Sequence, residues 1–272
     1  MLRMRAKVPV FIVLLLIIAS ASHAQDAPRQ REFQDLRSLL WLGSYNQFRL
    51  GDKWFWRAEF HYRRGDHDGV PFVGRMNQIY NRHAINYLVS PTFNISAGVV
   101  LRLDFTPNPG DDDLEYVVPE PRFWHEYLWV VPWPRFQMYH RIRIEHRWSR
   151  NNDVDSDWIY RDRWRYKFFM KIPLNSMRLE PGTIFFNPDV EILMHSGKPV
   201  IDSPFEDLRL YPSFGYIQSP RVTYTAGIMY TTGQALSDGS IYRQRWVVRI
   251  NAYINLDFRS EAKKVPSIRL SD

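Results

Sequence analysis

The feature that most constrains this chain is a two-residue alternation of apolar and polar side chains that continues over long segments. It is clearest at 93–105, where every second residue is apolar, and it recurs at 53–64, 136–148 and 245–258. A period of two places successive side chains on opposite faces of a β-strand. No long segment after residue 25 shows the 3.6-residue period of a helix. The sequence therefore predicts an all-β fold.

The predicted strands are longer than those of most soluble proteins. In sequence order we expect them at 38–50, 53–64, 77–90, 93–106, 122–131, 136–149, 158–173, 182–196, 206–218, 221–233 and 242–259. Soluble strands cluster near roughly five or six residues, whereas a tilted strand that crosses a bilayer needs about nine to eleven. The lengths favour an antiparallel up-and-down transmembrane β-barrel. A closed antiparallel barrel needs an even number of strands, so we expect about twelve (range ten to twelve), including a short first strand within the N-terminal segment 25–37.

The connections between these strands alternate in length. Short turns are predicted at 51–52, 90–92, 132–135 and 218–220, and long polar loops at 65–76, 106–121, 150–157, 197–205 and 233–240. The connection at 173–181 is intermediate. Outer-membrane barrels combine short periplasmic turns with long extracellular loops. We therefore expect the long loops to face outward from the cell and the C-terminus to face the periplasm.

The N-terminus has the three-part organisation of a secretory signal peptide. Three basic residues precede the apolar run 8–18, and small residues occupy positions −3 and −1 of a cleavage site after Ala24. The apolar run is too short for a membrane-spanning helix, which needs about 20 residues. We predict a signal peptide at 1–24, a single barrel domain at 38–259 and a polar C-terminal tail at 260–272. Export to the outer membrane of a Gram-negative cell follows from this reading.

Composition removes several classes of function. The chain has no cysteine, which excludes disulfides, thiol catalysis and cysteine-ligated metals. The formal charge of +7 falls to +4 when the three basic residues of the signal peptide are removed. An exported protein meets no nucleic acid in its working compartment, so the basic excess is better explained by arginines inside the fold. The expected partners are membrane lipid and small anionic solutes, with no cofactor and no metal.

Alternation alone does not say which face points inward. A soluble barrel buries its apolar face, whereas a membrane barrel turns that face to lipid. Strand length, the signal peptide and aromatic residues near the ends of the apolar faces, such as Trp54, Trp148 and Phe258, favour the membrane arrangement. A soluble periplasmic, lipocalin-like binder remains the alternative, because such barrels also alternate and are also exported.

If the apolar face meets lipid, the opposite face lines a strongly charged lumen. The lining residues that we predict are Arg57, Glu59, Arg63, Arg102, Glu126, Arg141, Arg143, Glu145, Arg147, Arg161, Arg163, Arg165, Glu191 and Arg249. In a narrow barrel, long arginines meet opposite carboxylates, and a buried charge is costly unless it is paired. One interpretation is an ion-pair network that fills the lumen of a structural barrel. The other is a narrow, porin-like pore that attracts anions through unpaired arginines.

The charged strands also carry a resemblance to a known family. The motifs in question are Lys53-Trp54 with Glu59 and Arg63, Glu120-Pro121-Arg122-Phe123-Trp124, the segment 140–147, the segment 161–166, Leu208-Arg209-Leu210-Tyr211, Gly215-Tyr216 and the segment 227–230. Together they resemble an outer-membrane β-barrel family known as domain of unknown function 2490. His146 departs from the polar amide expected at its position. The resemblance covers nearly the whole mature chain and implies a location and a fold, but no activity.

No set of residues in the sequence has the spacing expected of a catalytic or metal-binding site. A lipid or glycan hydrolase is the alternative function, and its nearest signature is His195-Ser196, whose side chains would point to opposite faces of a strand. His140 and His146 would share a strand face about 20 Å apart, too far for one metal ion at ~3.3 Å per residue. The acidic run 111–113 lacks the ligand spacing of a calcium loop. We therefore predict a non-enzymatic barrel.

Overall fold

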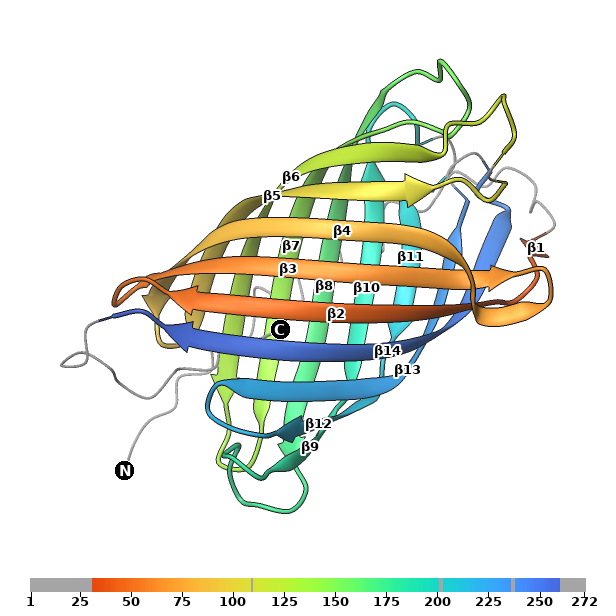
Figure 1. The fold of residues 1–272 in the computed structure, drawn as a ribbon. Coiled ribbons are helices and arrows are strands. Elements are labelled where there is room, and N and C mark those ends of the chain that lie inside the picture. Colours follow the sequence, from red (N-terminus) through yellow and green to blue (C-terminus); the bar gives the residue numbers. More distant parts are fainter. Residues whose placement is uncertain (1–30, 109, 201–202, 236–237, 260–272) are drawn as a thin grey trace, which may run out of the picture.

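The computed structural model describes residues 31–108, 110–200, 203–235 and 238–259, which form a closed β-barrel (Figure 1). Its strand segments are β1 (Glu32–Phe33), β2 (Arg37–Arg49), β3 (Trp54–His67), β4 (Val70–Ser90), β5 (Phe93–Phe105), β6 (Val117–Pro132), β7 (Gln137–Ser149), β8 (Ile159–Pro173), β9 (Ile184–Asn187), β10 (Asp189–Ser196), β11 (Phe205–Leu210), β12 (Ser213–Ile217), β13 (Val222–Gln234) and β14 (Ile241–Asp257). The described residues contain no helix, which confirms the all-β prediction. Accordingly, none of them forms a helix that is long and apolar enough to cross a membrane. The predicted signal peptide at 1–24 and the tail at 260–272 lie outside the described residues.

Eleven strands form the wall, because three of the segments continue a neighbour. β1 and β2 both lie alongside β14, so β1 prolongs the first strand. β9 and β10 both pair with β8 and are separated by Pro188, while β11 and β12 both pair with β13 and are separated by Tyr211 and Pro212. Proline has no N–H to donate and interrupts a ladder at these points. The count falls within the expected range of ten to twelve.

The barrel closes through a parallel seam between β14 and β2. The register runs from Arg245 opposite Arg37 to Asp257 opposite Arg49, whereas the other wall strands pair antiparallel. The favoured number of twelve strands is thus replaced by eleven, and the short strand expected in 25–37 does exist as β1, as an extension of the first strand. An odd number of strands leaves the first and last strands running in the same direction. A parallel ladder still pairs their backbone groups and removes both sheet edges.

The hairpin between β3 and β4 corrects one predicted loop. The segment 65–76 was expected as a long polar loop, but β3 and β4 continue through it to a two-residue turn at Asp68 and Gly69. Both turn residues have positive φ, 48° and 76°. This is the backbone of a type I′ turn, whose twist suits a β-hairpin and whose favoured sequences include Asp-Gly.

The remaining long loops gather at one end of the barrel, where β2 begins. The loop after β5 and the loop after β7 contact each other, with a β-bridge between Leu114 and Asp153. Arg150 donates to Glu115 from Nη2 to Oε2 at 2.6 Å, and this hydrogen bond lowers the pKa of the partly exposed Glu115 carboxyl. Short turns lie at the opposite end, together with the longer connection 174–183 between β8 and β9 (Figure 1). The expected alternation of short turns and long loops is thus present, apart from this connection and the β3–β4 hairpin.

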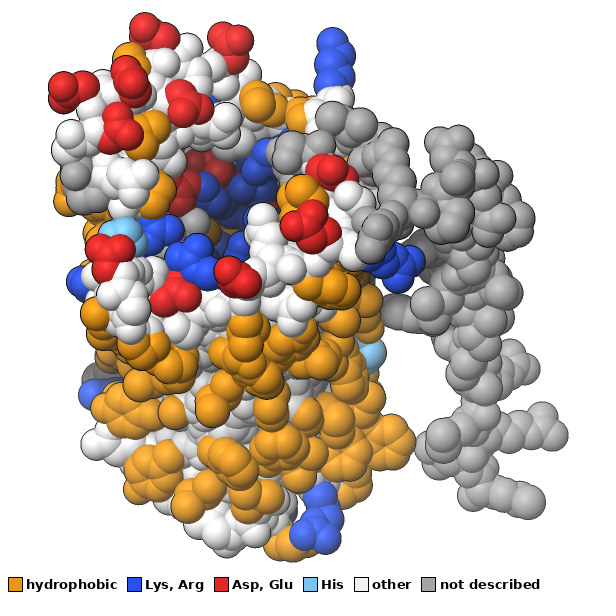
Figure 2. Space-filling model, turned by 90° about the vertical axis from the view of Figure 1, so that its right-hand side faces the viewer, with side chains coloured by type: hydrophobic (Ala, Val, Ile, Leu, Met, Phe, Trp, Pro, Cys, Tyr) orange, Lys and Arg blue, Asp and Glu red, His pale blue; other side chains and the backbone are white. Residues whose placement is uncertain are grey.

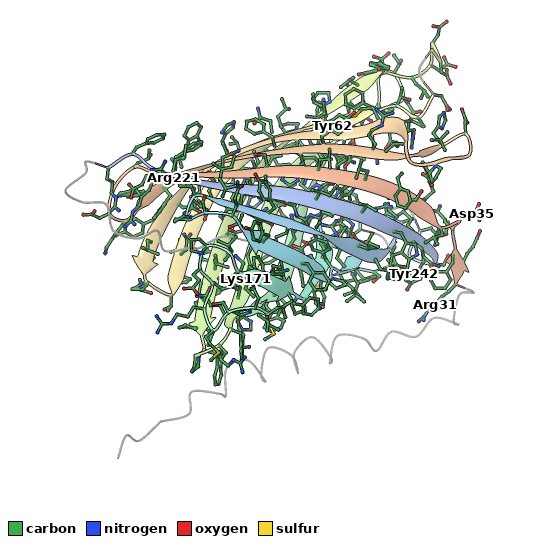
Figure 3. The ribbon with its side chains drawn as sticks, turned by 60° about the horizontal axis from the view of Figure 1, so that its bottom comes forward. Arg31, Asp35, Tyr62, Lys171, Arg221 and Tyr242 are labelled. Carbon is green, nitrogen blue, oxygen red and sulfur yellow. The ribbon has the colours of Figure 1, made fainter. Side chains whose placement is uncertain are left out.

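The two faces of each strand follow the predicted alternation. On β5, Val99 is 57% exposed and Val100 is 3% exposed. On β3, Trp54, Phe60 and Tyr62 are exposed on the outer wall. Figure 2 shows a broad hydrophobic outer surface, and Figure 3 shows side chains standing off both sides of the ribbon. The described barrel thus has an apolar exterior and a charged interior, the reverse of a soluble barrel.

Candidate functional site

The lumen has three levels along the barrel axis. At the short-turn end, packed aromatic and aliphatic side chains form what we call the apolar floor: Phe55, Leu88, Leu128, Tyr139, Phe169 and Phe185. Above the floor lies an ion-pair layer of arginines and glutamates. At the long-loop end a basic cavity opens, which we call the vestibule. The alternation predicted a charged lumen, whereas the apolar floor was not predicted.

The apolar floor is built on stacked aromatic rings. Tyr139 and Phe169 are fully buried, and their rings stack with centroids 4.4 Å apart. Lys171 lies against this stack, with its Nζ 5.2 Å from the Tyr139 ring. On the neighbouring wall the buried Phe185 ring covers Gly215, where any Cβ atom would collide with it. Glycine is therefore required at 215, and the ring fills the space that a side chain would occupy.

The ion-pair layer begins above the floor with Glu59 and Glu126. Arg57 donates to both, from Nη2 to Glu59 Oε1 at 2.6 Å and from Nη1 to Glu126 Oε1 at 2.9 Å. Arg82 donates from Nη1 to Glu59 Oε2 at 2.6 Å. Arg143 donates from Nε to Glu126 Oε2 at 2.6 Å. Each carboxylate thus accepts from at least two guanidinium groups, which offsets the cost of its burial.

Glu145 and Glu191 extend the layer toward β10. Arg165 joins them, donating from Nη1 to Glu145 Oε1 at 2.6 Å and from Nη2 to Glu191 Oε1 at 2.7 Å. Arg122 donates to Glu145 Oε2 at 2.8 Å, and Arg141 donates to Glu191 Oε1 at 2.9 Å. These pairs link the neighbouring wall strands β6, β7, β8 and β10, whereas the pair of Arg57 on β3 with Glu126 on β6 links strands that are not neighbours.

A buried tryptophan completes the layer. Trp124 has no exposed surface, and the guanidinium carbon of Arg143 lies 4.4 Å from the centre of its ring. Arg82 and Arg57 lie 5.7 and 5.8 Å from the same ring. Desolvated cation–π contacts of this kind are worth about 2 kcal/mol or more each. The space left in this layer is a cavity of about 50 Å³, enough for a few water molecules.

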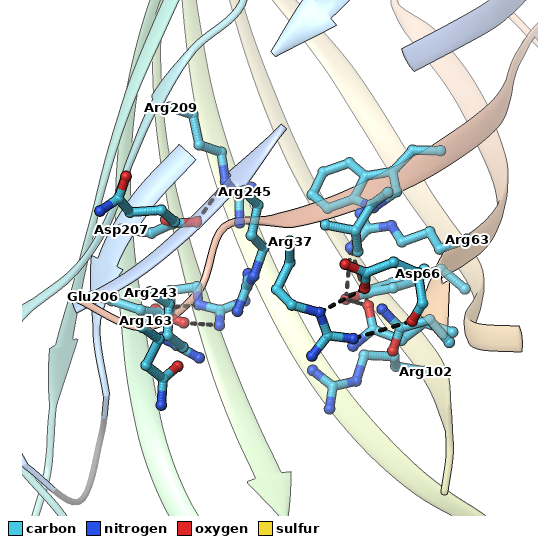
Figure 4. Close-up of a pocket in the computed structure, with 18 of the residues that line it drawn as sticks. Arg37, Arg63, Asp66, Arg102, Arg163, Glu206, Asp207, Arg209, Arg243 and Arg245 are labelled. Atoms are coloured by element: carbon cyan, nitrogen blue, oxygen red, sulfur yellow. Dashed lines mark hydrogen bonds and ion pairs between the residues drawn. The ribbon is translucent and has the colours of Figure 1, made fainter. Parts of the chain in front are cut away.

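The vestibule is much larger, at about 410 Å³. Its lining includes ten arginines and four carboxylates. The arginines are Arg37, Arg63, Arg75, Arg102, Arg147, Arg161, Arg163, Arg209, Arg243 and Arg245; the carboxylates are Asp35, Asp66, Glu206 and Asp207. Figure 2 shows a hollow lined by basic side chains at this end, and Figure 4 shows arginines entering it from several strands. The arginines of the lining outnumber its carboxylates by six, and the larger volume distinguishes the vestibule from the small cavity in the layer below.

Several vestibule arginines have carboxylate partners. Arg163 forms a bidentate pair with Glu206, in which Nε donates to Oε2 at 2.5 Å. Arg209 donates from Nε to Asp207 Oδ2 at 2.9 Å. Arg63 is held differently, since its guanidinium lies 3.7 Å from the centre of the Trp41 ring and so stacks on an aromatic face. These contacts fix part of the wall.

Three vestibule arginines are not neutralised in this way. Within the described part of the chain, no carboxylate lies within ion-pair distance of Arg75 on β4, Arg161 on β8 or Arg245 on β14, and none of these guanidinium groups has a hydrogen-bond partner. Burial disfavours an unpaired charge, so all three groups gain from a bound anion.

The predicted lumen residues all lie inside the barrel, but they belong to different levels. In the vestibule wall are Arg63, Arg102, Arg147, Arg161 and Arg163. In the ion-pair layer are Arg57, Glu59, Glu126, Arg141, Arg143, Glu145, Arg165 and Glu191. Arg249 makes no ion pair with a described residue and donates from Nη2 to Tyr45 Oη at 2.5 Å.

Several lumen residues escaped the sequence reading. Glu120 and Arg122 pair with each other at 2.5 Å, and the two-residue period carried back from Glu126 would have identified both. Glu206 and Asp207 are adjacent, yet both are buried beside lumen arginines, because a β-bulge interrupts the β10–β11 register there. Simple alternation places adjacent residues on opposite faces, so it could not have found this pair.

The serine and histidine candidates do not form a nucleophile and its base. His195 is buried in the lumen wall, 3.3 Å from Glu206, whereas Ser196 accepts a hydrogen bond from Trp164 Nε1 on the outer wall. On that wall Ser196 lies opposite Asp162, which in turn lies opposite His146. The carboxylate therefore stands between the hydroxyl and the imidazole.

No cluster of described histidine and carboxylate side chains has the arrangement of a metal site. No curated protein matches the chain. The family described as "Protein of unknown function (DUF2490)" matches residues 39–241, which span every wall strand from β2 to the first residue of β14. This match covers most of the chain and includes the ion-pair layer and most of the vestibule wall, whereas Asp35, Arg37, Arg243 and Arg245 lie outside it. The chain therefore belongs to this family of unknown function.

Proposed function

We propose that this chain is an outer-membrane β-barrel of a Gram-negative cell, exported through a cleaved signal peptide at 1–24. The apolar exterior supports this location, because large hydrophobic side chains such as Val99, Ile228 and Phe214 are more than half exposed on the wall. Exposed apolar surface of this extent is costly in water and is favourable in contact with lipid. The long loops and the vestibule then face outward from the cell, and the C-terminal end of β14 faces the periplasm.

We propose further that the barrel is a closed, anion-attracting cup with a structural role rather than an open pore. One observation carries this proposal: below the vestibule the lumen narrows to cavities of about 50 and 10 Å³. Trp124, Glu126, Glu145, Tyr139 and Phe169 are fully buried in a lumen whose upper part holds a cavity of about 410 Å³. A pore would leave the central side chains of the lumen in contact with water.

The experiment is conductance of refolded mature protein in a planar bilayer, together with its migration in detergent gels before and after heating. We expect heat-modifiable migration, which is typical of a closed membrane barrel, and no steady conductance. A Tyr139→Ala/Phe169→Ala variant should conduct, since it opens the apolar floor, while Trp129→Ala on the outer wall should stay silent. Steady anion-selective current through the unmodified protein would contradict the closed lumen. Migration unaffected by heat would contradict the membrane barrel.

A lipid or glycan hydrolase is not the function that the geometry favours. The imidazole of His146 donates from Nδ1 to Asp162 Oδ1, 2.7 Å away, and that carboxylate lies between the imidazole and Ser196. A serine nucleophile needs its base within hydrogen-bond reach. Phospholipid hydrolysis that is lost in a Ser196→Ala variant would overturn this conclusion.

A further inference from the structure

The charge of the vestibule is not balanced by its own residues. Ten arginines and four carboxylates line a cavity of about 410 Å³, and the arginines come from β2, β3, β4, β5, β7, β8, β11 and β14. Positive charge therefore surrounds the cavity rather than lying on one side of it (Figure 4). A concave wall of one sign raises the local concentration of ions of the opposite sign. The cavity is thus suited to an anion.

The available donors are placed on opposite parts of the wall. Arg161 lies on β8 and Arg245 on β14, which are separated by β10, β11 and β13 around the barrel. Neither guanidinium has a carboxylate partner among the described residues. The buried Trp41 also lines the cavity, and its Nε1, which can only donate, has no hydrogen-bond partner. A ligand that satisfies all three must offer acceptor oxygens in at least two places.

The volume limits the size of that ligand. Pockets for small molecules commonly measure about 300–1,000 Å³, so 410 Å³ suits a compact metabolite and not a polymer. The floor and the ion-pair layer close the cavity below, so the ligand would enter and leave at the long-loop end. Guanidinium groups pair with phosphate and carboxylate oxygens in a planar, bidentate geometry.

We propose that the vestibule is a binding site for a small solute that carries two or more phosphate or carboxylate groups, held between Arg161 and Arg245. The proposal deepens the proposed function and rests on it only for the direction from which the ligand arrives. The site itself depends on the unpaired guanidinium groups and on the excess charge of the wall.

The test is calorimetric titration of the full mature protein in detergent with inorganic pyrophosphate and citrate, using neutral trehalose as the comparison. We expect both anions to bind, with an affinity that falls as salt is added, and trehalose not to bind. Arg161→Gln and Arg245→Gln should each weaken pyrophosphate binding about tenfold, the loss of one charge-assisted hydrogen bond. Arg221→Gln is the matched control, because Arg221 is exposed in a turn at the opposite end (Figure 3).

A second readout separates binding from a merely structural role. Without ligand, Arg161 and Arg245 add to an uncompensated positive charge, so both glutamine variants should resist heat at least as well as the unmodified protein. If the arginine binds the ligand, its glutamine variant should have unchanged or higher thermal stability and weaker anion binding. A structural arginine predicts lower stability, and that result would overturn the proposal.

Other outcomes are equally decisive. Absence of pyrophosphate and citrate binding at low salt would overturn the site, as would an equal loss in Arg221→Gln. If anion binding is absent in a protein that shows heat-modifiable migration and no conductance in bilayers, only the anion site is wrong and the proposed function stands. Conversely, if the barrel conducts ions and also binds pyrophosphate, the proposal of a closed lumen is wrong, while the proposed anion site still stands.

Discussion

The lumen glutamates are the residues on which the interior most depends. Glu126 accepts hydrogen bonds from Arg57 and Arg143, and Glu145 accepts from Arg122 and Arg165. The inward neighbours on the same strand are Trp124 and Leu128 for Glu126, and Arg143 and Arg147 for Glu145, so no second carboxylate on the strand can replace either one. Breaking a buried ion pair from one side leaves an uncompensated charge, which is more costly than never having buried the pair.

The change Glu126→Gln should therefore destabilise the barrel by about 3–5 kcal/mol. The measurement is the urea midpoint of unfolding from lipid vesicles. Glu115→Gln is the matched control, because Glu115 has an arginine partner of similar geometry but lies in an exposed loop. Its effect should be far smaller. Equal midpoints for the two variants would show that the ion-pair layer does not support the fold.

At this scale, the sequence predicted most of the lumen lining. Arg57 and Glu59, or Arg141 and Arg143, occupy every second position of a strand, and period two was enough to place them inward. Glu206 could not be placed in this way, because it faces the lumen through a bulge. Period two also places Leu128 inward, two residues from Glu126, but an apolar residue among charged ones does not by itself indicate that it closes the lumen.

The strands and turns, as elements, follow local rules closely. Predicted strand bounds lie within a few residues of the observed ones, except at β3, β4 and β6, whose strands extend further into the long-loop end. The Asp68-Gly69 turn explains the extension of β3 and β4. These two residues favour a tight hairpin turn, but they lie within a polar segment that was predicted as a loop. For this connection, the Asp-Gly dipeptide predicts the turn better than the length of the polar segment does.

Substitutions at Gly69 test whether the hairpin has a type I′ turn. A Cβ atom at Gly69 would meet no neighbour within 4 Å, so a substitution there acts through the backbone, whose φ is +76°. Gly69→Val should cost about 1–2 kcal/mol, because a β-branched residue resists the left-handed region. Gly69→Asn should cost much less, since asparagine tolerates that region. Unfolding midpoints compare the two, and equal losses would contradict a type I′ turn.

The molecule as a whole is defined by how the sheet closes. Eleven strands close only because β14 and β2 pair in parallel, and no local pattern specifies that contact: Ser38 and Trp246 are neighbours in space and far apart in sequence. The sequence predicted two faces and a barrel, but the parity of the strand number depends on a pairing between the chain's two ends. Closure leaves an apolar outer surface and an enclosed, charged interior.

Adjacent single cysteines on β5 measure this division directly, in a chain that has no cysteine of its own. Val99→Cys and Val100→Cys differ by one residue and should face opposite sides of the wall. In lipid vesicles, a nitroxide at 99 should be relaxed strongly by oxygen, which dissolves in lipid, and weakly by a water-soluble nickel chelate. A nitroxide at 100 should be protected from both. Strong relaxation at 99 by the nickel chelate, with oxygen acting preferentially at 100, would contradict an apolar exterior in lipid around a closed, charged lumen.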